Sequence, residues 1–360
     1  MKILYVITQL GLGGAETVLV TMANKMAQKG YDVQVISLLN ICEHVFDPRV
    51  EVCVLDFKNR FFYSLIQLIT IIRKRSPDIV HSHCLHANVL IRLIRLSGIR
   101  IKKLISTSHS PFEGDGVIMK IYKYTNFISD HITNVSRHAV KVFEEKGYVH
   151  IGEMKVMYNI IDIEKFKYSE SIRLFQRNKF NISDQEKVII SIGTMKDAKD
   201  YPNLLNAINI FRKNNTIDFR FYIVGEGELF DEMLELSSSL KLNDVVYFLG
   251  KRRDIYELLC MSDIFVLSSK YEGLPTVLIE AIMANNYIVS TNCGGVSEIL
   301  PTKFRTVEIG NPFNLAQEIG RVITLEHNVS EFDKSILLDF VEDKFSSNNT
   351  LNVWIELYNS

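Results

Sequence analysis

The stretch that decides the fold is Ser268-Ser269-Lys270-Tyr271-Glu272-Gly273-Leu274-Pro275-Thr276-Val277-Leu278-Ile279-Glu280-Ala281. An apolar run, Ile264–Leu267, precedes it and is typical of a buried parallel strand, and apolar residues at helical spacing follow it. Pro275 suits a first helical turn because the N–H that it lacks would have no partner there. We therefore predict a strand, a tight loop and a helix start, whose free N–H groups and positive dipole end favour a phosphate.

Two carboxylates bracket this predicted helix start, Glu272 before it and Glu280 within it. Eight residues at the helical rise separate them by about 12 Å, which is too far for the carboxylate pair of a glycoside hydrolase. The spacing suits a site in which the two carboxylates bind opposite ends of a nucleotide-sugar. The simpler alternative is an acidic residue near the positive end of a helix, followed by a solvated Glu.

Length and composition indicate an ordinary globular protein of two domains. The chain has 360 residues, of which 47% are hydrophobic and 23% charged, with 18 Gly and 7 Pro. No apolar run approaches the ~18 residues of a membrane span, and Met1-Lys2 leads directly into a strand instead of a signal peptide. Five cysteines without a Cys-x-x-Cys pair favour reduced thiols, so we expect a cytoplasmic protein.

Charge is distributed unevenly, although the net charge is only −1. Residues 1–160 hold 20 Lys and Arg against 13 Asp and Glu, whereas residues 161–360 hold 21 against 29. The basic first half suggests an anionic partner, such as a membrane surface or a phosphate-bearing acceptor.

The first half alternates strands and helices, which predicts a doubly wound parallel sheet. The predicted strands are 2–8, 32–38, 50–55, 78–81, 103–108, 131–135 and 155–157. The glycine loop Gly11-Leu12-Gly13-Gly14-Ala15-Glu16 follows the first strand, but Glu16 stands where a dinucleotide fingerprint needs its third glycine. The acidic residue that would hold a ribose is also missing after the second strand, so NAD binding is rejected and an anion-binding glycine loop remains.

Histidines lie at two predicted strand ends. His109 follows the strand 103–108, at the edge where doubly wound sheets bind ligands, although a single His is more often structural than catalytic. His81, His83 and His86 invite a zinc interpretation, but no acidic or thiolate partner completes a ligand set at familiar spacing.

Two basic segments, Lys58–Arg75 and Arg92–Lys103, have the pattern of amphipathic helices. Either they are core helices with solvated ends, or their cations meet anionic lipid while Phe61, Phe62 and Tyr63 enter the headgroup layer. The second alternative would place the protein at the inner face of the plasma membrane as a peripheral protein.

The pattern breaks after Asp162, and the polar residues 163–186 are interpreted as an irregular interdomain linker. A second alternating series follows, with strands predicted at 188–192, 219–224, 245–248, 264–267, 287–290 and 305–307. We therefore predict an N-terminal domain over 1–162 and a C-terminal domain over 163–344. The tail has helical spacing, and a helix at about 345–360 is expected to complete the first domain.

Several stretches together resemble the retaining family 4 glycosyltransferases, of the bacterial surface-polysaccharide type. E-G-L-P-T-V-L-I-E is similar to the family's E-x7-E motif, G-L-G-G-A-E to its first glycine loop, and T-S-H-S to its strand-end histidine. S-I-G-T-M-K-D-A-K resembles the G-R-x4-K phosphate loop, V-G-E-G-E-L the glycine turn near the base, and C-G-G-V-S-E the G-G-x-x-E ending. The resemblance covers nearly the whole chain and implies the GT-B fold, with two Rossmann-like domains facing a cleft.

The resemblance also implies roles for single residues. Two would be catalytic or face the transferred sugar, His109 and Glu272. The others would bind the nucleotide-sugar donor: Gly13 and Gly14 at the diphosphate and acceptor, Lys199, Gly273 and Leu274 at the phosphates, Gly225 and Gly227 near the base, and Glu280 on the ribose. Thr194 departs from the pattern, because the family has an arginine there; Lys196 is a neighbouring cation but lacks the bidentate fork of Arg.

The implied function is transfer of a hexose or N-acetylhexosamine from a nucleotide diphosphate sugar, UDP-sugar first, with retained configuration. The acceptor would be a glycan or a lipid-linked molecule, bound by the N-terminal domain, and the C-terminal domain would bind the donor. Neither a cofactor nor a metal is expected, since the sequence has no Asp-x-Asp motif. The alternatives are a UDP-sugar 2-epimerase on the same architecture and a non-catalytic partner in a synthase complex.

Overall fold

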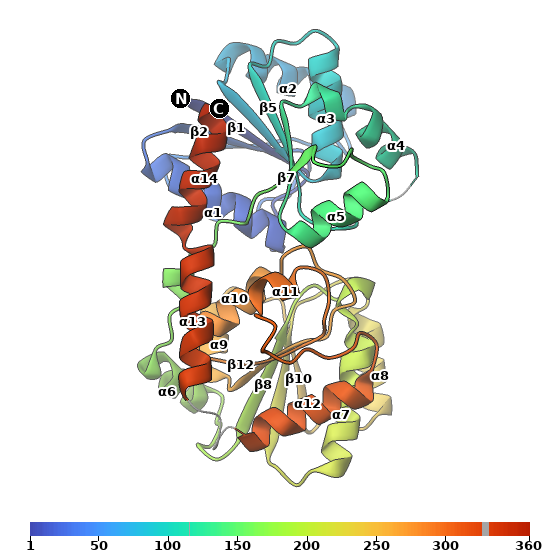
Figure 1. Cartoon of the computed structure of the whole chain (residues 1–360), viewed down its shortest axis with the longest axis vertical. Coiled ribbons are helices and arrows are strands. Elements are labelled where there is room, and N and C mark those ends of the chain that lie inside the picture. The colour runs from blue at the N-terminus through green and yellow to red at the C-terminus, as the bar shows by residue number, and fades with distance from the viewer. Residues whose placement is uncertain (115, 326–330) are drawn as a thin grey trace. The chain divides into compact units, whose positions relative to one another are not determined.

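The computed structural model describes residues 1–114, 116–325 and 331–360. The chain divides into two compact units, Met1–Ile161 with Ser347–Ser360, and Asp162–Ser346 (Figure 1). The sequence places the boundaries at 162 and about 345. Each unit is an α/β domain built on one parallel sheet.

The first unit contains a seven-stranded sheet of order β3-β2-β1-β4-β5-β6-β7, in which every pairing is parallel. Its strands are β1 Lys2–Ile7, β2 Asp32–Ser37, β3 Glu51–Val54, β4 Ile79–His83, β5 Lys103–Ser108, β6 His131–Asn134 and β7 Met154–Val156. Its α-helices are α1 Gly14–Gln28, α2 Phe61–Arg75, α3 Leu85–Leu96, α4 Val117–Tyr124, α5 Arg137–Glu145 and α14 Ser347–Asn359.

Both faces of this sheet are buried, which explains its continuous apolar strands. Successive side chains of β1 point to opposite faces. Ile3 and Tyr5 pack in a cluster with residues of α1 and α14, whereas Leu4 and Val6 pack with residues of α2 and α3. The sheet therefore has helices on both sides, as a doubly wound fold requires.

The C-terminal helix α14 is an integral part of this first core. Trp354 is buried and donates its indole N–H to the Tyr158 carbonyl at 3.1 Å. The Tyr358 hydroxyl lies 2.7 Å from His81 Nδ1 and 3.1 Å from the Tyr5 hydroxyl. The last helix of the chain thus packs directly against strands β1 and β4.

The second unit contains a five-stranded parallel sheet of order β10-β9-β8-β11-β12. Its strands are β8 Lys187–Ile192, β9 Phe219–Val224, β10 Val246–Gly250, β11 Ile264–Leu267 and β12 Tyr287–Ser290. Its α-helices are α6 Glu170–Lys179, α7 Tyr201–Asn214, α8 Phe230–Ser239, α9 Ile255–Met261, α10 Thr276–Met283, α11 Val296–Ile299, α12 Pro312–Leu325 and α13 Glu331–Phe345. The prediction of two doubly wound parallel sheets is confirmed.

Three local predictions are wrong. Residues 163–186 are not an irregular linker, because α6 lies there and its buried Arg177 donates to the carbonyls of Met261 and Glu186. Val307 forms only an isolated bridge with Thr291, so 305–307 is not a regular strand. Helix α3 ends at Leu96, so the helix predicted over Arg92–Lys103 does not exist as such.

Arg92 also contradicts the lipid-facing interpretation of its segment, because it is completely buried. Its guanidinium donates to the Tyr122 carbonyl at 3.1 Å and to Asn126 Oδ1 at 2.8 Å. It also lies 4.3 Å from the centre of the Tyr122 ring. Arg92 therefore joins α3 to α4 inside the domain, and periodicity alone could not separate this role from a surface one.

No helix among the described residues is long and apolar enough to cross a bilayer.

Replacing Tyr358 with Phe should destabilise the first unit by about 1–3 kcal/mol, because it leaves His81 Nδ1 buried without its partner. The measurement is urea unfolding followed by the fluorescence of Trp354, the one tryptophan of the chain. As a control, Val353→Ala on the half-exposed side of α14 should change the free energy of unfolding by less than about 0.5 kcal/mol. Equal stability of Tyr358→Phe and wild type would contradict the assigned hydrogen bond.

Candidate functional site

The strand orders place a topological switch point in each unit, where ligands of doubly wound sheets bind beyond the carboxyl ends of the strands. In the second unit, the connections turn to opposite sides of the sheet between neighbours β8 and β11. The two loops at this point are 193–200, which follows β8, and 268–275, which follows β11. These two loops hold four of the nine predicted donor-binding residues: Thr194, Lys199, Gly273 and Leu274.

An ion pair joins the two loops. Lys199 Nζ lies 2.6 Å from Glu272 Oε1, which also accepts the hydroxyl of Ser269 at 2.6 Å. The Lys199 and Glu272 side chains are only 15% and 13% exposed, so the pair is shielded far more than a surface salt bridge. The structure therefore brings together two predicted site residues that are far apart in the sequence.

The loop backbones are also tied together. Ser268 Oγ donates to the Lys199 carbonyl at 2.8 Å, and the Lys270 N–H donates to the Ala198 carbonyl at 2.8 Å. Gly193 contributes through its missing side chain, since a Cβ there would lie 3.0 Å from Lys199 Cε. The ammonium of Lys199 is thus positioned by its stem as well as by its partner.

Helix α10 begins at Thr276, with Pro275 as the residue that precedes it. Gly273 and Leu274 are buried, and their backbone N–H groups have no hydrogen-bond partner among the residues that the structure describes. Free N–H groups at a helix N-terminus form an anion-binding site, because the helix dipole adds positive potential there. Lys199 lies close to this helix start through its contact with Glu272.

Two pairs of glycines allow backbones to approach closely around the site. A Cβ at Gly294 would lie 2.0 Å from the Glu272 carbonyl oxygen, and one at Gly295 would lie 2.1 Å from that of Gly273. A Cβ at Gly225 would lie 2.0 Å from the carbonyl oxygen of Gly193, and φ there is +135°. Gly227 likewise approaches Met195, with 2.4 Å to its carbonyl oxygen. Gly225 and Gly227 are thus required by the packing of the loop 193–200 itself.

Glu280 lies in α10, and among the described residues no hydrogen bond contributes to the pKa of its carboxyl. Burial raises the pKa of the Glu280 carboxyl to about 7, against a smaller opposite effect of the Lys165 charge. A carboxyl group in this state gains from hydroxyl donors, because they favour its charged form.

The missing arginine is not replaced within the loop by a buried cation. The side chains of Thr194 and Lys196 are both exposed, and the Lys196 N–H donates to the Thr194 carbonyl at 2.9 Å. Lys199 is therefore the cation of this loop that is held inside the site.

The first unit has its own switch point between β1 and β4. Gly13 caps α1, and its carbonyl accepts the Thr17 N–H at 3.0 Å. A Cβ at Gly13 would lie 2.3 Å from Glu16 Oε2, so this carboxylate folds over the loop. A Cβ at Gly14 would meet no atom within 4 Å, so internal packing does not require glycine at that position.

His109 lies directly after β5, next to His83, and this contact was not predicted from the sequence. His109 Nε2 is 2.9 Å from Nδ1 of His83, the last residue of β4. The His109 backbone N–H donates to Glu113 Oε1 at 2.6 Å. Burial lowers the pKa of His109 to about 4 and raises the pKa of Glu113 to about 7. The imidazole is thus neutral at pH 7.

The zinc interpretation of the histidines finds no support. His81 Nε2 lies 2.6 Å from the Thr107 hydroxyl, while His86 is exposed on α3. In the part of the chain that the structure describes, no three His, Cys, Asp or Glu side chains gather as a metal site.

Ser269, Glu113 and the contact of His83 with His109 are parts of the site that the sequence alone does not predict. The signals were weak: Ser269 lies three residues before Glu272, and Glu113 lies four residues after His109. Neither spacing predicts a contact between the side chains unless the conformation of the loop is known.

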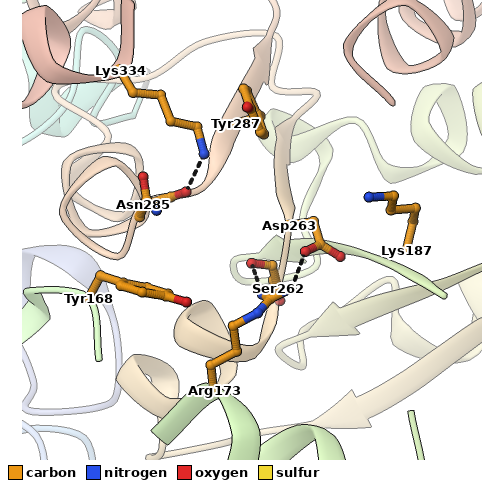
Figure 2. A pocket seen from close by; sticks show the side chains of 8 residues that line it. All are labelled: Tyr168, Arg173, Lys187, Ser262, Asp263, Asn285, Tyr287 and Lys334. Carbon is orange, nitrogen blue, oxygen red and sulfur yellow. Dashed lines mark hydrogen bonds and ion pairs between the residues drawn. The ribbon is translucent and has the colours of Figure 1, made fainter. Parts of the chain in front are cut away.

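A separate polar hollow of about 340 Å³ lies near the amino ends of β8, β11 and β12 (Figure 2). Arg173 donates to the Ser262 carbonyl at 3.2 Å and pairs with Asp263, and Lys334 donates to the Asn285 carbonyl at 2.9 Å. These cations bind groups of the domain itself, at the sheet edge opposite the loops described above.

Comparisons with known proteins agree with this geometry. The family model "Glycosyltransferase Family 4" matches residues 12–165, and "Glycosyl transferases group 1" matches residues 172–335. An uncharacterized glycosyltransferase of Methanocaldococcus jannaschii is 30% identical over 65% of this chain and 60% of its own length. The Escherichia coli UDP-Gal:alpha-D-GlcNAc-diphosphoundecaprenol alpha-1,3-galactosyltransferase is 28% identical over 67% of this chain and 64% of its own length. The chain therefore matches less than two thirds of either relative.

Among solved structures, HepE of Anabaena in complex with UDP-glucose superposes with a TM-score of 0.84, covering 100% of this chain and 99% of that chain. At 18% identity, this likeness shows the fold, and the predicted GT-B class with two Rossmann-like domains is confirmed. Two glycosyltransferase domain models that are separated only by residues 166–171, together with relatives named as glycosyltransferases, show that the chain belongs to the family 4 glycosyltransferases.

Proposed function

We propose that this glycosyltransferase moves a hexose or N-acetylhexosamine from a nucleotide diphosphate sugar, UDP-sugar first, to a glycan or lipid-linked acceptor. The anomeric configuration is retained, and no metal is needed. The observation that carries the proposal is the Lys199–Glu272 pair beside the N–H groups of Gly273 and Leu274, which have no hydrogen-bond partner among the described residues.

This arrangement suits departure of a diphosphate. Negative charge grows on the leaving phosphate in the transition state, so preorganised positive groups near it lower the barrier. Lys199 supplies an ammonium and the start of α10 supplies backbone N–H groups, which together do the work that a divalent cation does elsewhere.

Glu272 is better suited to accept hydrogen bonds from hydroxyl groups than to act as a nucleophile. Its Oε1 already receives Lys199 and Ser269, and both contacts reduce the electron density that an attack on carbon requires. We therefore assign Glu272 to the hydroxyls of the donor sugar and Glu280 to those of the ribose. Retention then follows from attack on the face that the phosphate leaves, with the phosphate oxygen helping to remove the acceptor proton.

The first unit would supply Gly13, Gly14 and His109. Gly14 supports this role, because a Cβ at this position would meet no atom within 4 Å and the glycine therefore leaves space for a ligand. The proposal further assigns the backbone near Gly225 and Gly227 to the base and Thr194 to the phosphate loop.

Incubation with a panel of nucleotide-sugars, read by thermal shift, tests the donor assignment, because a ligand raises stability in proportion to its occupancy. NMR of the product's anomeric proton then tests retention. Conversion of a UDP-sugar into its 2-epimer without any acceptor would contradict glycosyl transfer.

Lys199→Ala should lower donor turnover more than ~10-fold, since it removes at least ~1.4 kcal/mol of charge stabilisation in the transition state. Steady-state kinetics at saturating acceptor measure the loss. The matched control is Lys213→Ala on an exposed side chain of the same unit, which should keep wild-type turnover. A Lys199→Ala enzyme as active as wild type would remove this residue from the mechanism.

Donor binding should tighten as pH rises, because of Glu280. The empty site holds this carboxyl with a pKa of about 7, and hydroxyl donors favour its charged form, so binding releases a proton below that pH. If the bound group regains its ordinary pKa of 4.5, affinity for a UDP-sugar increases ~10-fold between about pH 6 and pH 8. Calorimetric titrations measure the effect.

Glu280→Gln is the control for this pH dependence, since the amide does not titrate. It should bind the UDP-sugar more weakly at the upper pH and with a flatter profile. Tighter binding of the donor to wild type at the lower pH would refute the assigned role of Glu280.

A peripheral membrane contact through α2 is the second part of the proposal. Phe61, Phe62, Tyr63 and Ile66 are exposed on this helix, Phe62 at 79%. Lys58, Arg60, Arg73 and Lys74 are exposed on or next to it. Exposed aromatic rings beside cations are typical of helices that lie in a headgroup layer. A lipid-linked acceptor would make such a contact useful.

We expect the protein to float with vesicles that contain anionic lipid, and to dissociate at high salt. Phe62→Ala should reduce the floated fraction severalfold, because it removes apolar area from the interface. Phe175→Ala removes another exposed ring, 67% exposed, from α6 in the other unit and should have no effect. Flotation that ignores both salt and lipid charge would exclude the electrostatic contact.

A further inference from the structure

The contact between His83 and His109 limits which ring nitrogen can carry the proton in each histidine. The two rings approach through His83 Nδ1 and His109 Nε2 at 2.9 Å, which is hydrogen-bond distance. Their planes are 26° apart, with centroids separated by 5.2 Å. Each ring has one further nitrogen, His83 Nε2 and His109 Nδ1, and both are buried without a partner among the described residues.

Both rings are neutral at pH 7. Burial lowers the pKa of His109 to about 4, and burial is also the main cause that lowers the pKa of His83 well below its usual range. A neutral imidazole carries one N–H, so the contact holds a single proton and one ring must be the donor.

Two arrangements satisfy this condition. If His109 donates its Nε2–H to His83 Nδ1, then the one N–H of His83 lies at Nε2, where it is buried and has no partner among the described residues. If His83 donates from Nδ1, then His83 Nε2 is only a lone pair and the unpaired N–H lies at His109 Nδ1. An unpaired acceptor is tolerated more readily in a core than an unpaired N–H.

The position of each ring decides between them. His83 is completely buried in the central strand β4, with its ring centre 4.1 Å from that of His81 and 5.9 Å from that of Tyr5. His109 is half-buried at the end of β5, in the loop that a ligand of the switch point would reach. The two unpaired ring nitrogens are buried alike, but only His109 is a partly exposed residue at the sheet edge that a ligand would approach, so the unpaired N–H is less costly there.

We infer that His83 is a positioning residue that donates its Nδ1–H to His109 Nε2 and thereby holds His109 in the Nδ1–H tautomer, as a hydrogen-bond donor to an oxygen of the transferred sugar. The sugar contact rests on the proposed function. The tautomer does not, since it is fixed within the protein.

The surroundings hold both histidines in place for this role. Cys84 adopts φ of +70°, ends β4 directly after His83, and donates its N–H to the Thr107 carbonyl at 3.0 Å. Such a backbone conformation is strained for a residue other than glycine and is found where the surrounding structure demands it. The main chain of His109 is fixed in turn by the Glu113 carboxylate.

Long-range ¹H–¹⁵N correlation spectra of the ¹⁵N-histidine-labelled full chain, without donor, read the tautomer of each neutral ring. Comparison with His109→Gln identifies the signals of His109. We expect the Nδ1–H form in wild type and in His83→Asn, whose amide N–H can replace that of the imidazole. In His83→Leu, His109 should change to the Nε2–H form that the free histidine side chain prefers. An Nε2–H or doubly protonated His109 in wild type at pH 7 would overturn the inference.

Kinetics add a second readout that a general loss of structure would not reproduce. His83→Leu should lower kcat roughly tenfold, the effect of one lost hydrogen bond in the transition state, with donor KM changed less than about threefold. His83→Asn should recover most of the turnover, and His86→Leu, on an exposed histidine of α3, should match wild type. Equal turnover in His83→Leu and wild type would overturn the positioning role. Full activity of His109→Gln would instead overturn the proposed sugar contact and leave the tautomer assignment in place.

Discussion

The ion pair between Lys199 and Glu272 depends on a single constraint, the order in which parallel strands meet. Because β8 pairs with β11, the loops that follow them emerge at the same sheet edge, and two residues separated by 72 intervening positions come within 2.6 Å. Each loop is then shaped by backbone contacts that only glycine permits. Gly225 accommodates the carbonyl of Gly193, and Gly294 accommodates the carbonyl of Glu272. The charges are positioned by main chain, which costs little reorganisation when a charged ligand arrives.

The alternation of strands and helices could be predicted from the sequence because parallel strands buried on both faces are continuous apolar runs. Glu272 and Glu280 could be selected because they bracket a predicted helix start, and Lys199 because it stands at the lysine of a family motif. Their mutual arrangement could not be predicted, because strand order is a property of the whole sheet. Arg92 shows the same limit. Its spacing suits a surface helix, yet its five-donor head finds Tyr122, Asn126 and Ser129 inside the domain.

The helix α6 was missed for a related reason. Its residues are polar, and burial of its arginines depends on partners that are distant in sequence: Arg173 and Arg177 both reach Asp263, which also accepts the Val188 N–H at 2.7 Å. Asp263 thus links α6 to the first residues of β8 and β11. From the sequence, a polar segment of this kind looks like a linker. Its composition does not reveal that some of its charged side chains are buried against distant partners.

The two switch points use opposite electrostatics. In the second unit, a charged pair is kept in a shielded site. Under the proposed function, a phosphate would bind Lys199 while sugar hydroxyls bind Glu272, so each charge would keep a partner throughout. In the first unit, the groups at the strand ends are buried imidazoles that stay neutral. A neutral ring can donate a hydrogen bond without attracting an anion, whereas an imidazolium would attract one. Burial of His83 and His109 therefore keeps these strand ends uncharged. The C-terminal helix packs on the neighbouring ring of His81, since the Trp354 ring lies 5.0 Å from it and His81 lies 4.1 Å from His83.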